Sequence, residues 1–429
     1  NIHSHPSIWG IGFILVPVIG GLAVTWLTQT FAPEASGHGV PEVMNAIYYQ
    51  GGKIRPIVAI IKAIASAISI GSAGSVGREG PIIQIGAAFG SAMGQLTHLT
   101  TRQRNILIAA GCAAGIAATF NAPLGGITFA IELMMVSINA ISVTLVTIST
   151  VIATAIGRLF LGVLPSFNVP SLRVPSIGTI PFHTLLLFIP FGILIGLLSA
   201  LFIRSIYSTE DLLKKISNPY MRTIVGTLIL GVLLYLTMRY AGHYYIDGVG
   251  YSTILDMLRN VIINPWFLLL LAAMKLLATS LTLGSGASGG IFSPSLFIGA
   301  SFGSAFGFGV NHLIPGLHLH PTLFIIAGMA GMVGGSTGAV ITASIMLFEQ
   351  TRDYHDILPM MITVALAYAV RIRITAESIY TLKLARRGHV LPQGLQANIV
   401  ASRRAKDVQE PNFHILTEEE LESYKEKAH

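Results

Sequence analysis

Long runs of apolar residues constrain this chain more than any other feature of its sequence. A helix that crosses a membrane needs about 20 mostly apolar residues. Windows of this kind lie near residues 10–30, 57–76, 105–119, 124–161, 183–203, 222–240, 263–283, 296–312, 322–348 and 357–370. Only 10% of the 429 residues are charged, against roughly 25% in a soluble domain. The sequence therefore predicts an all-α protein that crosses the membrane many times, with most of its surface facing lipid.

One segment of the chain occurs twice. Residues 81–94 (PIIQIGAAFGSAMG) and 294–307 (PSLFIGASFGSAFG) are identical at nine of fourteen positions, at an offset of 213 residues. Glu132 and Glu349 recur at an offset of 217. Duplicated halves are typical of transporter folds, which bind substrate near the midplane of the membrane. We predict a first membrane repeat, a linker, a second membrane repeat and a cytoplasmic tail, at residues 1–165, 166–180, 181–385 and 386–429.

Three segments rich in Gly and Pro interrupt the apolar runs, at residues 37–42 (GHGVPE), 77–81 (GREGP) and 289–294 (GGIFSP). Pro suits the first turn of a helix, so each segment is expected to begin a helix inside the membrane. The free N–H groups and positive dipole end of a helix N-terminus attract anions. Three converging N-termini would bind a small anion without a full positive charge that could prevent its release. Ordinary helix capping is the alternative.

These three segments resemble the signature sequences of the CLC family of chloride channels and chloride/proton exchangers. Tyr380 lies where the family places a pore tyrosine, and the similarity extends from about residue 10 to 390. The resemblance implies an inverted repeat of tilted and broken transmembrane helices, with one pore in each subunit of a homodimer. It implies that Glu79 is the gating residue. The anion-binding residues would be Gly37, His38, Gly39, Val40, Pro41, Arg78, Glu79, Gly80, Gly290, Ile291, Phe292 and Tyr380.

The residue types around Glu79 point the same way. An ionisable side chain inside a membrane is a functional candidate by default. A carboxylate at a helix N-terminus can occupy the place of the anion, and protonation would neutralise it and open the path. The alternative is a buried Glu that only caps its helix. Arg78 is either an anion ligand or a structural partner of this turn. Lys62, inside an apolar run, either acts on the anion at a distance or is a paired or snorkelling lysine.

Two residues depart from the family pattern. The central Ser of the first motif is His38 here. A neutral imidazole can donate an N–H to chloride and titrates near neutral pH; alternatively, the ring points away and the backbone alone binds. Proton-exchanging members commonly carry a Glu where this chain has Leu133, and its absence favours passive conduction. Glu132 is then either a candidate for the proton path or a structural carboxylate echoed by Glu349.

The sequence therefore predicts a chloride channel gated by protonation of Glu79, with a chloride/proton antiporter as the alternative. A membrane-embedded enzyme would need a catalytic pair or a metal cluster, but the thirteen histidines are scattered without ligand spacing. A cation transporter would need more carboxylates inside the membrane. The lone Cys112 excludes an internal disulfide. We expect no metal, no cofactor and no binding of nucleic acid, and chloride as the bound substrate.

Basic residues at the ends of segments indicate the orientation in the membrane. Those between Arg371 and Arg404 place the C-terminus in the cytoplasm by the positive-inside rule, and we expect the cell membrane. The segment from Arg386 resembles the family's lead into a nucleotide-sensing CBS pair, which the printed sequence does not contain. The chain starts without Met close to a spanning segment, so an N-terminal piece is expected to be missing.

Overall fold

A computed structural model of the chain describes residues 8–163, 182–314, 319–389 and 391. The linker expected at 166–180 and the part of the predicted tail after residue 391 lie outside the described residues. The first half contains α1 (Val16–Phe31), α2 (Val40–Tyr49), α3 (Ile57–Gly71), α4 (Glu79–Leu96), α5 (Thr101–Phe120), α6 (Pro123–Phe129) and α7 (Ala140–Leu161). A π-helical turn, η3 (Ala130–Met134), follows α6.

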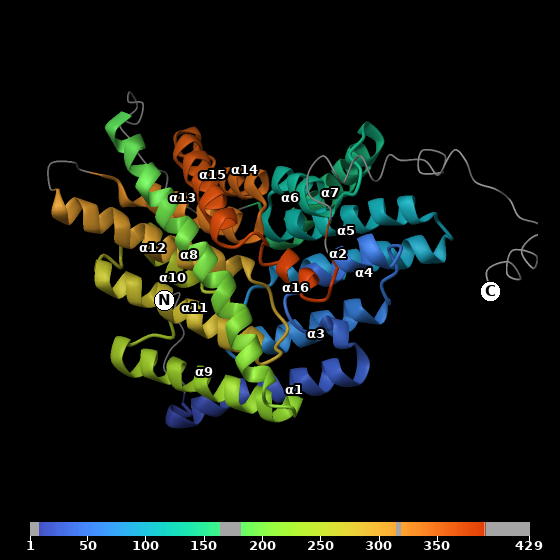
Figure 1. The fold of residues 1–429 in the computed structure, drawn as a ribbon, viewed down its shortest axis with the longest axis horizontal. Helices are drawn as coiled ribbons and strands as arrows, with labels where there is room; N and C mark the ends of the chain where they lie inside the picture. The colour runs from blue at the N-terminus through green and yellow to red at the C-terminus, as the bar shows by residue number, and fades with distance from the viewer. Residues whose placement is uncertain (1–7, 164–181, 315–318, 390, 392–429) are drawn as a thin grey trace, which may run out of the picture. The chain divides into compact units, whose positions relative to one another are not determined.

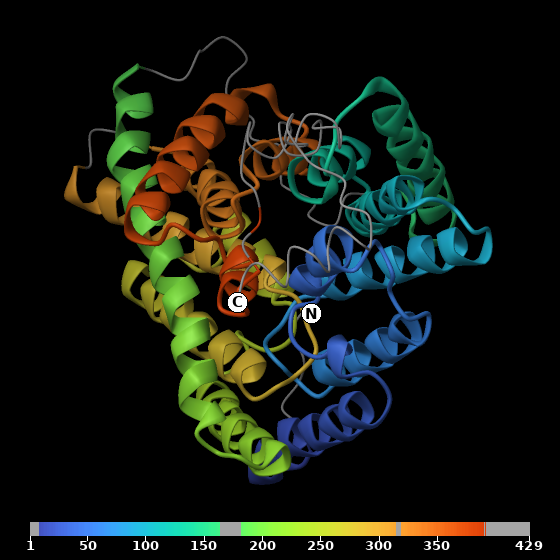
Figure 2. The ribbon, with the colours of Figure 1, turned by 45° about the vertical axis from the view of Figure 1, so that its right-hand side comes forward.

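The second half begins with α8, the longest helix of the described chain. Its helices are α8 (Phe182–Lys214), α9 (Pro219–Ala241), α10 (Tyr251–Leu258), α11 (Pro265–Gly284), α12 (Phe292–Leu313), α13 (Pro321–Thr337), α14 (Val340–Thr351), α15 (Ile357–Ile374) and α16 (Thr381–Ala385). Short 3-10 turns, η1 (Gly10–Leu15), η2 (Pro33–Ala35) and η5 (Tyr354–Asp356), precede α1, α2 and α15. In Figures 1 and 2, most helices of the first half lie on one side and most helices from α8 onward lie on the other, and α1 packs on α9, α6 on α14 and α2 on α16.

The prediction of an all-α membrane protein is confirmed. Six helices of the described residues are long and apolar enough to cross a membrane, and three shorter apolar helices accompany them. The apolar window at 124–161 does not form one span: it divides into α6, η3 and α7, because Asn139 caps the N-terminus of α7 with its side chain. The window at 322–348 divides at Gly338, which ends α13 with a φ of 83°.

The duplicated segments fold alike and pack alike. In the first half α4 packs on α5, and in the second half α12 packs on α13. A Cβ atom on Gly86 would lie 2.2 Å from the carbonyl oxygen of Gly111, and one on Gly299 would lie 2.2 Å from that of Gly328. Only glycine allows these helices to cross so closely. The repeat is therefore visible in the helix crossings as well as in the sequence.

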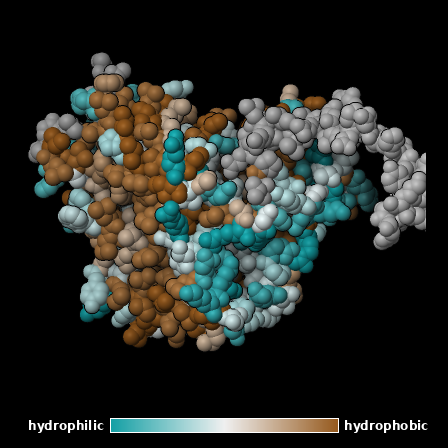
Figure 3. Space-filling model, viewed as in Figure 1, coloured by the Kyte–Doolittle hydropathy of each residue, from teal (hydrophilic) through white to brown (hydrophobic). Residues whose placement is uncertain are grey.

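The surface divides by polarity as expected for a membrane protein. Figure 3 shows a broad hydrophobic face on the left, where Figure 1 places the helices of the second half. A hydrophilic area lies right of centre, near α2, α3 and α16. Large apolar side chains on the long helices are exposed, such as Trp26 and Leu201, both 53% exposed. These faces are suited to contact with lipid.

Candidate anion site and pathway

The three Gly- and Pro-rich breaks meet in space. Gly77 and Gly290 exchange two backbone hydrogen bonds, of 2.8 and 2.6 Å, although 213 residues separate them. The N–H of Gly289 donates to the carbonyl of Gly37 at 3.2 Å, which joins the first break to the third. Helices α2, α4 and α12 begin beside these contacts, at Val40, Glu79 and Phe292. The structure therefore gathers three helix N-termini, the arrangement that can bind an anion with backbone N–H groups.

Close backbone approach holds this junction together. A Cβ atom on Gly80 would lie 2.4 Å from the carbonyl oxygen of His38, and one on Gly290 would lie 2.6 Å from the backbone nitrogen of Gly80. These distances are far below van der Waals contact, and the opposing atoms belong to backbone that cannot move aside easily. Gly39 has a φ of 81°, which favours glycine at the start of α2. The glycines of the motifs are thus required by the convergence itself.

His38 and Tyr380 lie next to each other at this junction. Their ring centroids are 5.8 Å apart. The backbone just before Tyr380 is fixed, because the hydroxyl of Tyr207 donates a hydrogen bond to the carbonyl of Ile379 at 2.6 Å. His38 is only 4% exposed, and its Nδ1 atom has no hydrogen-bond partner among the described residues. A buried polar atom without a partner is costly, by about 1–3 kcal/mol. The imidazole is therefore placed to hydrogen-bond a bound species beside the tyrosine.

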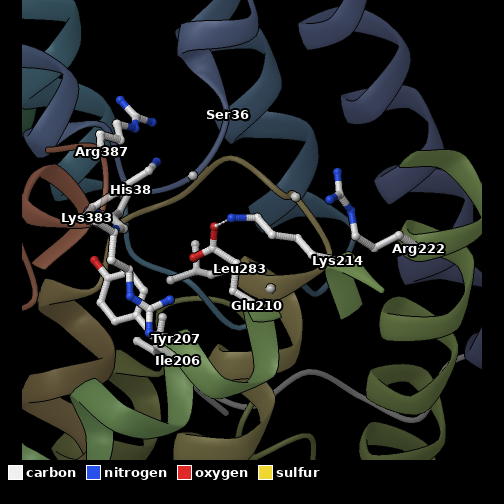
Figure 4. A pocket seen from close by; sticks show the side chains of 14 residues that line it. Ser36, His38, Ile206, Tyr207, Glu210, Lys214, Arg222, Leu283, Lys383 and Arg387 are labelled. Carbon is white, nitrogen blue, oxygen red and sulfur yellow. Dashed lines mark ion pairs between the residues drawn. The ribbon is translucent and has the colours of Figure 1, made fainter. Parts of the chain in front are cut away.

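A pocket of about 340 Å³ leads to His38. We call it the basic pocket, because, among the described residues, five cationic side chains and only one carboxylate, that of Glu210, line it. Its lining residues are Ser36, Gly37, His38, Ile206, Tyr207, Glu210, Lys214, Arg222, Leu283, Gly284, Gly286, Lys383, Arg386 and Arg387. Figure 4 shows His38 and Lys383 on one side and Lys214 and Arg222 on the other. A hollow with an excess of cations raises the local concentration of anions.

Ion pairs restrain the cations of the basic pocket without neutralising all of them. Glu42 accepts from both Lys383 and Arg387, at 3.3 and 2.7 Å. Arg386 contacts Asp211 at 2.9 Å. The Glu42 carboxylate thus pairs with two cations at once, which leaves a net positive charge beside His38. An anion can be attracted there without meeting a single tightly binding cation.

The Glu79 carboxylate points onto the N-terminus of α12. It is 1% exposed. Its Oε1 atom accepts hydrogen bonds from the hydroxyl of Tyr251, at 2.6 Å, and from the hydroxyl of Ser293. Its Oε2 atom accepts from the backbone N–H of Ser293 at 3.4 Å. The carboxylate therefore takes a helix N-terminal N–H group of the kind that an anion would use. Arg78 lies 5.6 Å above the ring of Tyr251, as a structural partner of that side chain.

Sequence reasoning missed Tyr251, Ser293 and Lys275. The signal that could have found Tyr251 is a second copy of the first motif. Gly248-Val249-Gly250-Tyr251 aligns with Gly37-His38-Gly39-Val40 at an offset of 211, close to that of the duplicated segment.

Two buried lysines, Lys62 and Lys275, are also related by the repeat, at an offset of 213. Both are 0% exposed. Lys62 donates to the carbonyls of Ala35 and Gly37, at 2.9 and 2.7 Å, in the loop before α2. Lys275 donates to carbonyls in the loop before α10, including that of Gly248 at 2.8 Å. Each lysine thus fixes the loop that leads into a short helix, which is the paired role considered for Lys62.

Glu132 and Glu349 cap each other's half of the molecule. The carboxylate of Glu132 accepts from the backbone N–H groups of Ile341 and Thr342, at 3.1 and 2.9 Å, at the start of α14. The carboxylate of Glu349 accepts from those of Leu124 and Gly125, at 3.0 and 2.7 Å, at the start of α6. This reciprocal arrangement agrees with the structural reading of Glu132. Its two oxygens are engaged by the N-terminus of α14.

Comparisons with known proteins agree with this geometry. The family model described as voltage gated chloride channel matches residues 20–371. The chain belongs to the CLC family. It is therefore an integral, multi-pass membrane protein of an anion-transporting family. Relatives in this family include the H(+)/Cl(-) exchange transporter ClcA of Vibrio parahaemolyticus, 33% identical over 400 residues, which cover 90% of this chain and 82% of the relative. ClcA of Yersinia pestis is 31% identical, with 88% and 78% of the two chains covered.

A solved CLC structure has a similar fold. The structure of a slow cyanobacterial Cl⁻/H⁺ antiporter superposes with a TM-score of 0.77 at 28% identity, covering 89% of this chain and 88% of that one. The inverted-repeat fold expected from the resemblance is thus confirmed. As for metals, no group of three or more His, Cys, Asp or Glu side chains that could hold an ion occurs among the residues that the structure describes.

Proposed function

We propose that this CLC protein is a chloride/proton antiporter in which Glu79 carries the proton. The observation that carries the proposal is the position of the Glu79 carboxylate on the N-terminus of α12, where it competes with an anion for the same N–H groups. In this proposal, the ionised Glu79 carboxylate must take up a proton before it can leave the N-terminus of α12. Each opening of the path to an anion would then consume a proton, which couples the two movements.

The proposal reverses the preference for passive conduction that Leu133 suggested. The relatives named above are called exchange transporters, which supports exchange over conduction. Glu132 is a poor relay in this scheme, because its carboxylate caps α14. The His38 imidazole lines the basic pocket and lies beside Tyr380, so we propose it as the group for proton transfer on that side.

In the proposed cycle the anion passes between the basic pocket and the junction of α2, α4 and α12. The pocket collects anions, and His38 and Tyr380 bind one with N–H and O–H donors. Protonation of Glu79 then frees the N-terminus of α12 for the anion. We propose further that the basic pocket and the C-terminus face the cytoplasm of a cell, and that the protein is a homodimer with one pore in each subunit. Mass photometry at a high protein-to-lipid ratio tests the dimer; a purely monomeric population argues against it.

One experiment decides between antiport and conduction. The full chain is purified, placed in liposomes, and given an outward chloride gradient with no pH difference. An antiporter moves protons inward as chloride leaves and so builds up a pH difference, which a pH-sensitive dye inside the liposomes reports. Chloride efflux without any proton movement, with the membrane potential clamped by K⁺ and valinomycin, would mean that the protein is a passive channel.

His38→Ser tests the imidazole as an anion ligand and proton carrier. Because Ser keeps one donor, we expect chloride transport to continue with altered preference among chloride, bromide and nitrate. If His38 also transfers protons, the number of protons moved per chloride falls at least about twofold, since a hydroxyl does not titrate in this range. Unchanged anion preference and unchanged stoichiometry would mean that only the backbone of this segment binds. His243→Ser, on the loop before α10, is the matched control.

A further inference from the structure

We infer that Tyr251 and Ser293 form a hydroxyl clamp that holds ionised Glu79 over the N-terminus of α12 and sets the pH at which transport turns on. The inference rests on the proposed gating role of Glu79 and adds two positioning residues to it. Tyr251 lies outside the three Gly- and Pro-rich breaks, and Ser293 lies in the third break but was not predicted as an anion ligand or gate. The clamp joins three elements, since Glu79 begins α4, Tyr251 begins α10 and Ser293 lies in the first turn of α12.

The contacts of the clamp suit a carboxylate better than a carboxylic acid. Both hydroxyls reach the same atom, Oε1 of Glu79, and the two hydroxyl oxygens are 3.1 Å apart. An ionised carboxylate only accepts hydrogen bonds, so both hydroxyls can donate to it at once. A protonated Glu79 would bring a donor of its own, and one hydroxyl would have to turn away. Hydrogen bonds to a charged acceptor are also stronger than those to a neutral one.

Other groups hold Tyr251 in place. Lys275 ties down the loop before α10 through the carbonyls of Ile246 and Gly248, at 3.0 and 2.8 Å. Gly250 precedes the tyrosine with a φ of 81°, and a Cβ atom there would lie 2.7 Å from the ring of Phe297. The guanidinium of Arg78 covers one face of the Tyr251 ring. The loop before α10 therefore has little freedom to move, and it positions the Tyr251 hydroxyl against Glu79.

The comparison of the two repeats separates this role from ordinary packing. Tyr251 corresponds to Val40 at the offset of 211, and Ser293 corresponds to Gly80 at the offset of 213. Neither counterpart carries a hydroxyl. The fold thus accepts an apolar residue or glycine at the related positions, and the two hydroxyls occur only in the half that faces Glu79. They are a specialisation of the gate, not a requirement of the helix starts.

The charged and titratable groups that act on Glu79 come from every side. They are Arg78 beside it, Tyr251 from α10, Lys275 from α11 and Tyr380 before α16. Ser293 is its contact from α12 and does not titrate. Arg78 and Lys275 stay near the carboxylate whether or not the clamp is present. Removal of a clamp hydroxyl should therefore weaken the closed state without abolishing it.

The test uses chloride flux of the full chain in liposomes as a function of pH. Tyr251→Phe and Ser293→Ala each remove one hydroxyl and keep the remaining shape. Because the ionised form loses a donor, half-activation is expected to move to higher pH, by about one unit for a tenfold change in the protonation equilibrium. Tyr245→Phe is the matched control, since Tyr245 lies in the same loop but packs its ring on Phe267, and its profile should match that of wild type.

The same substitutions in a Glu79→Gln background identify the cause. Gln has no titration for the clamp to shift, so Tyr251→Phe and Ser293→Ala should then leave the pH profile unchanged. A shift that persists in this background, or wild-type profiles for both single variants, would overturn the clamp. The measurement, chloride flux as a function of pH, does not depend on coupled movement of protons. A passive channel gated by Glu79 would show the same shift, so failure of antiport and failure of the clamp are distinguishable.

Discussion

Replacement of Glu79 by Gln is expected to keep anion flux, remove its activation by acid and abolish any proton movement coupled to chloride. Gln has the shape of the protonated acid and carries no charge, so it no longer competes with an anion for the N-terminus of α12. Flux should stay near the acid-activated level of wild type at every pH measured, from about pH 4.5 to about 7.5, because Gln does not titrate. Flux and proton movement are measured in the same liposomes.

The controls for this substitution separate charge from position. Glu79→Ala removes the side chain and should behave like Glu79→Gln. Glu34→Gln removes a carboxylate that pairs with Arg55 at 2.6 Å outside the junction, and it should keep the acid activation of wild type. If Glu79→Gln retained the pH profile of wild type, Glu79 would be a helix cap and the gating mechanism would be wrong.

Gly290→Ala is expected to lose at least about tenfold in transport, because the added methyl group would enter the junction of the second and third breaks. Its carbon would lie 2.6 Å from the backbone nitrogen of Gly80. Forcing atoms into such a packed position typically costs about 1–3 kcal/mol. The strain would be relieved by separation of the two segments, which moves the start of α4 away from that of α12. Chloride flux and the thermal unfolding temperature in detergent check this.

Gly309→Ala, within the helix α12 that follows Gly290, is the matched control. A Cβ atom on Gly309 would have no neighbour within 4 Å. Ala is favoured over Gly inside a helix by about 1 kcal/mol, so this variant should transport normally and unfold at the same or a higher temperature. Normal transport by Gly290→Ala would show that the close approach of the two segments is not needed for function.

The sequence predicted the all-α membrane architecture well, because the composition of the chain determines it. Apolar windows and scarce charge leave few alternatives to a bundle of membrane helices. The repeat at 81–94 and 294–307 predicted that two halves fold alike. The boundaries were harder to predict. The window at 124–161 looks continuous in hydropathy, and the division of α6 from α7 depends on a cap at Asn139 that hydropathy does not register.

The surroundings of Glu79 were only partly predictable. Glu79 stood out because an ionisable side chain inside an apolar membrane segment seldom has a purely structural role. Tyr251 did not stand out, since a Tyr near a helix start is ordinary, and its contact with Glu79 joins residues 172 positions apart. Lys275 was missed for the same reason. Its role is visible only where its amine meets the carbonyls of the loop before α10.

The sequence by itself determined the class of fold, the duplication and the chemistry of the three breaks, because hydropathy and glycine or proline at a helix start act locally. Only the tertiary structure decided which groups meet. It brought Ser293 and Tyr251 onto Glu79, turned Glu132 toward α14, and left Nδ1 of His38 without a partner among the described residues. A hydrogen bond acts over about 3 Å, whereas the residues that contact Glu79 are far apart from it in the chain. Packing of the two halves selects these contacts, and no local pattern encodes them.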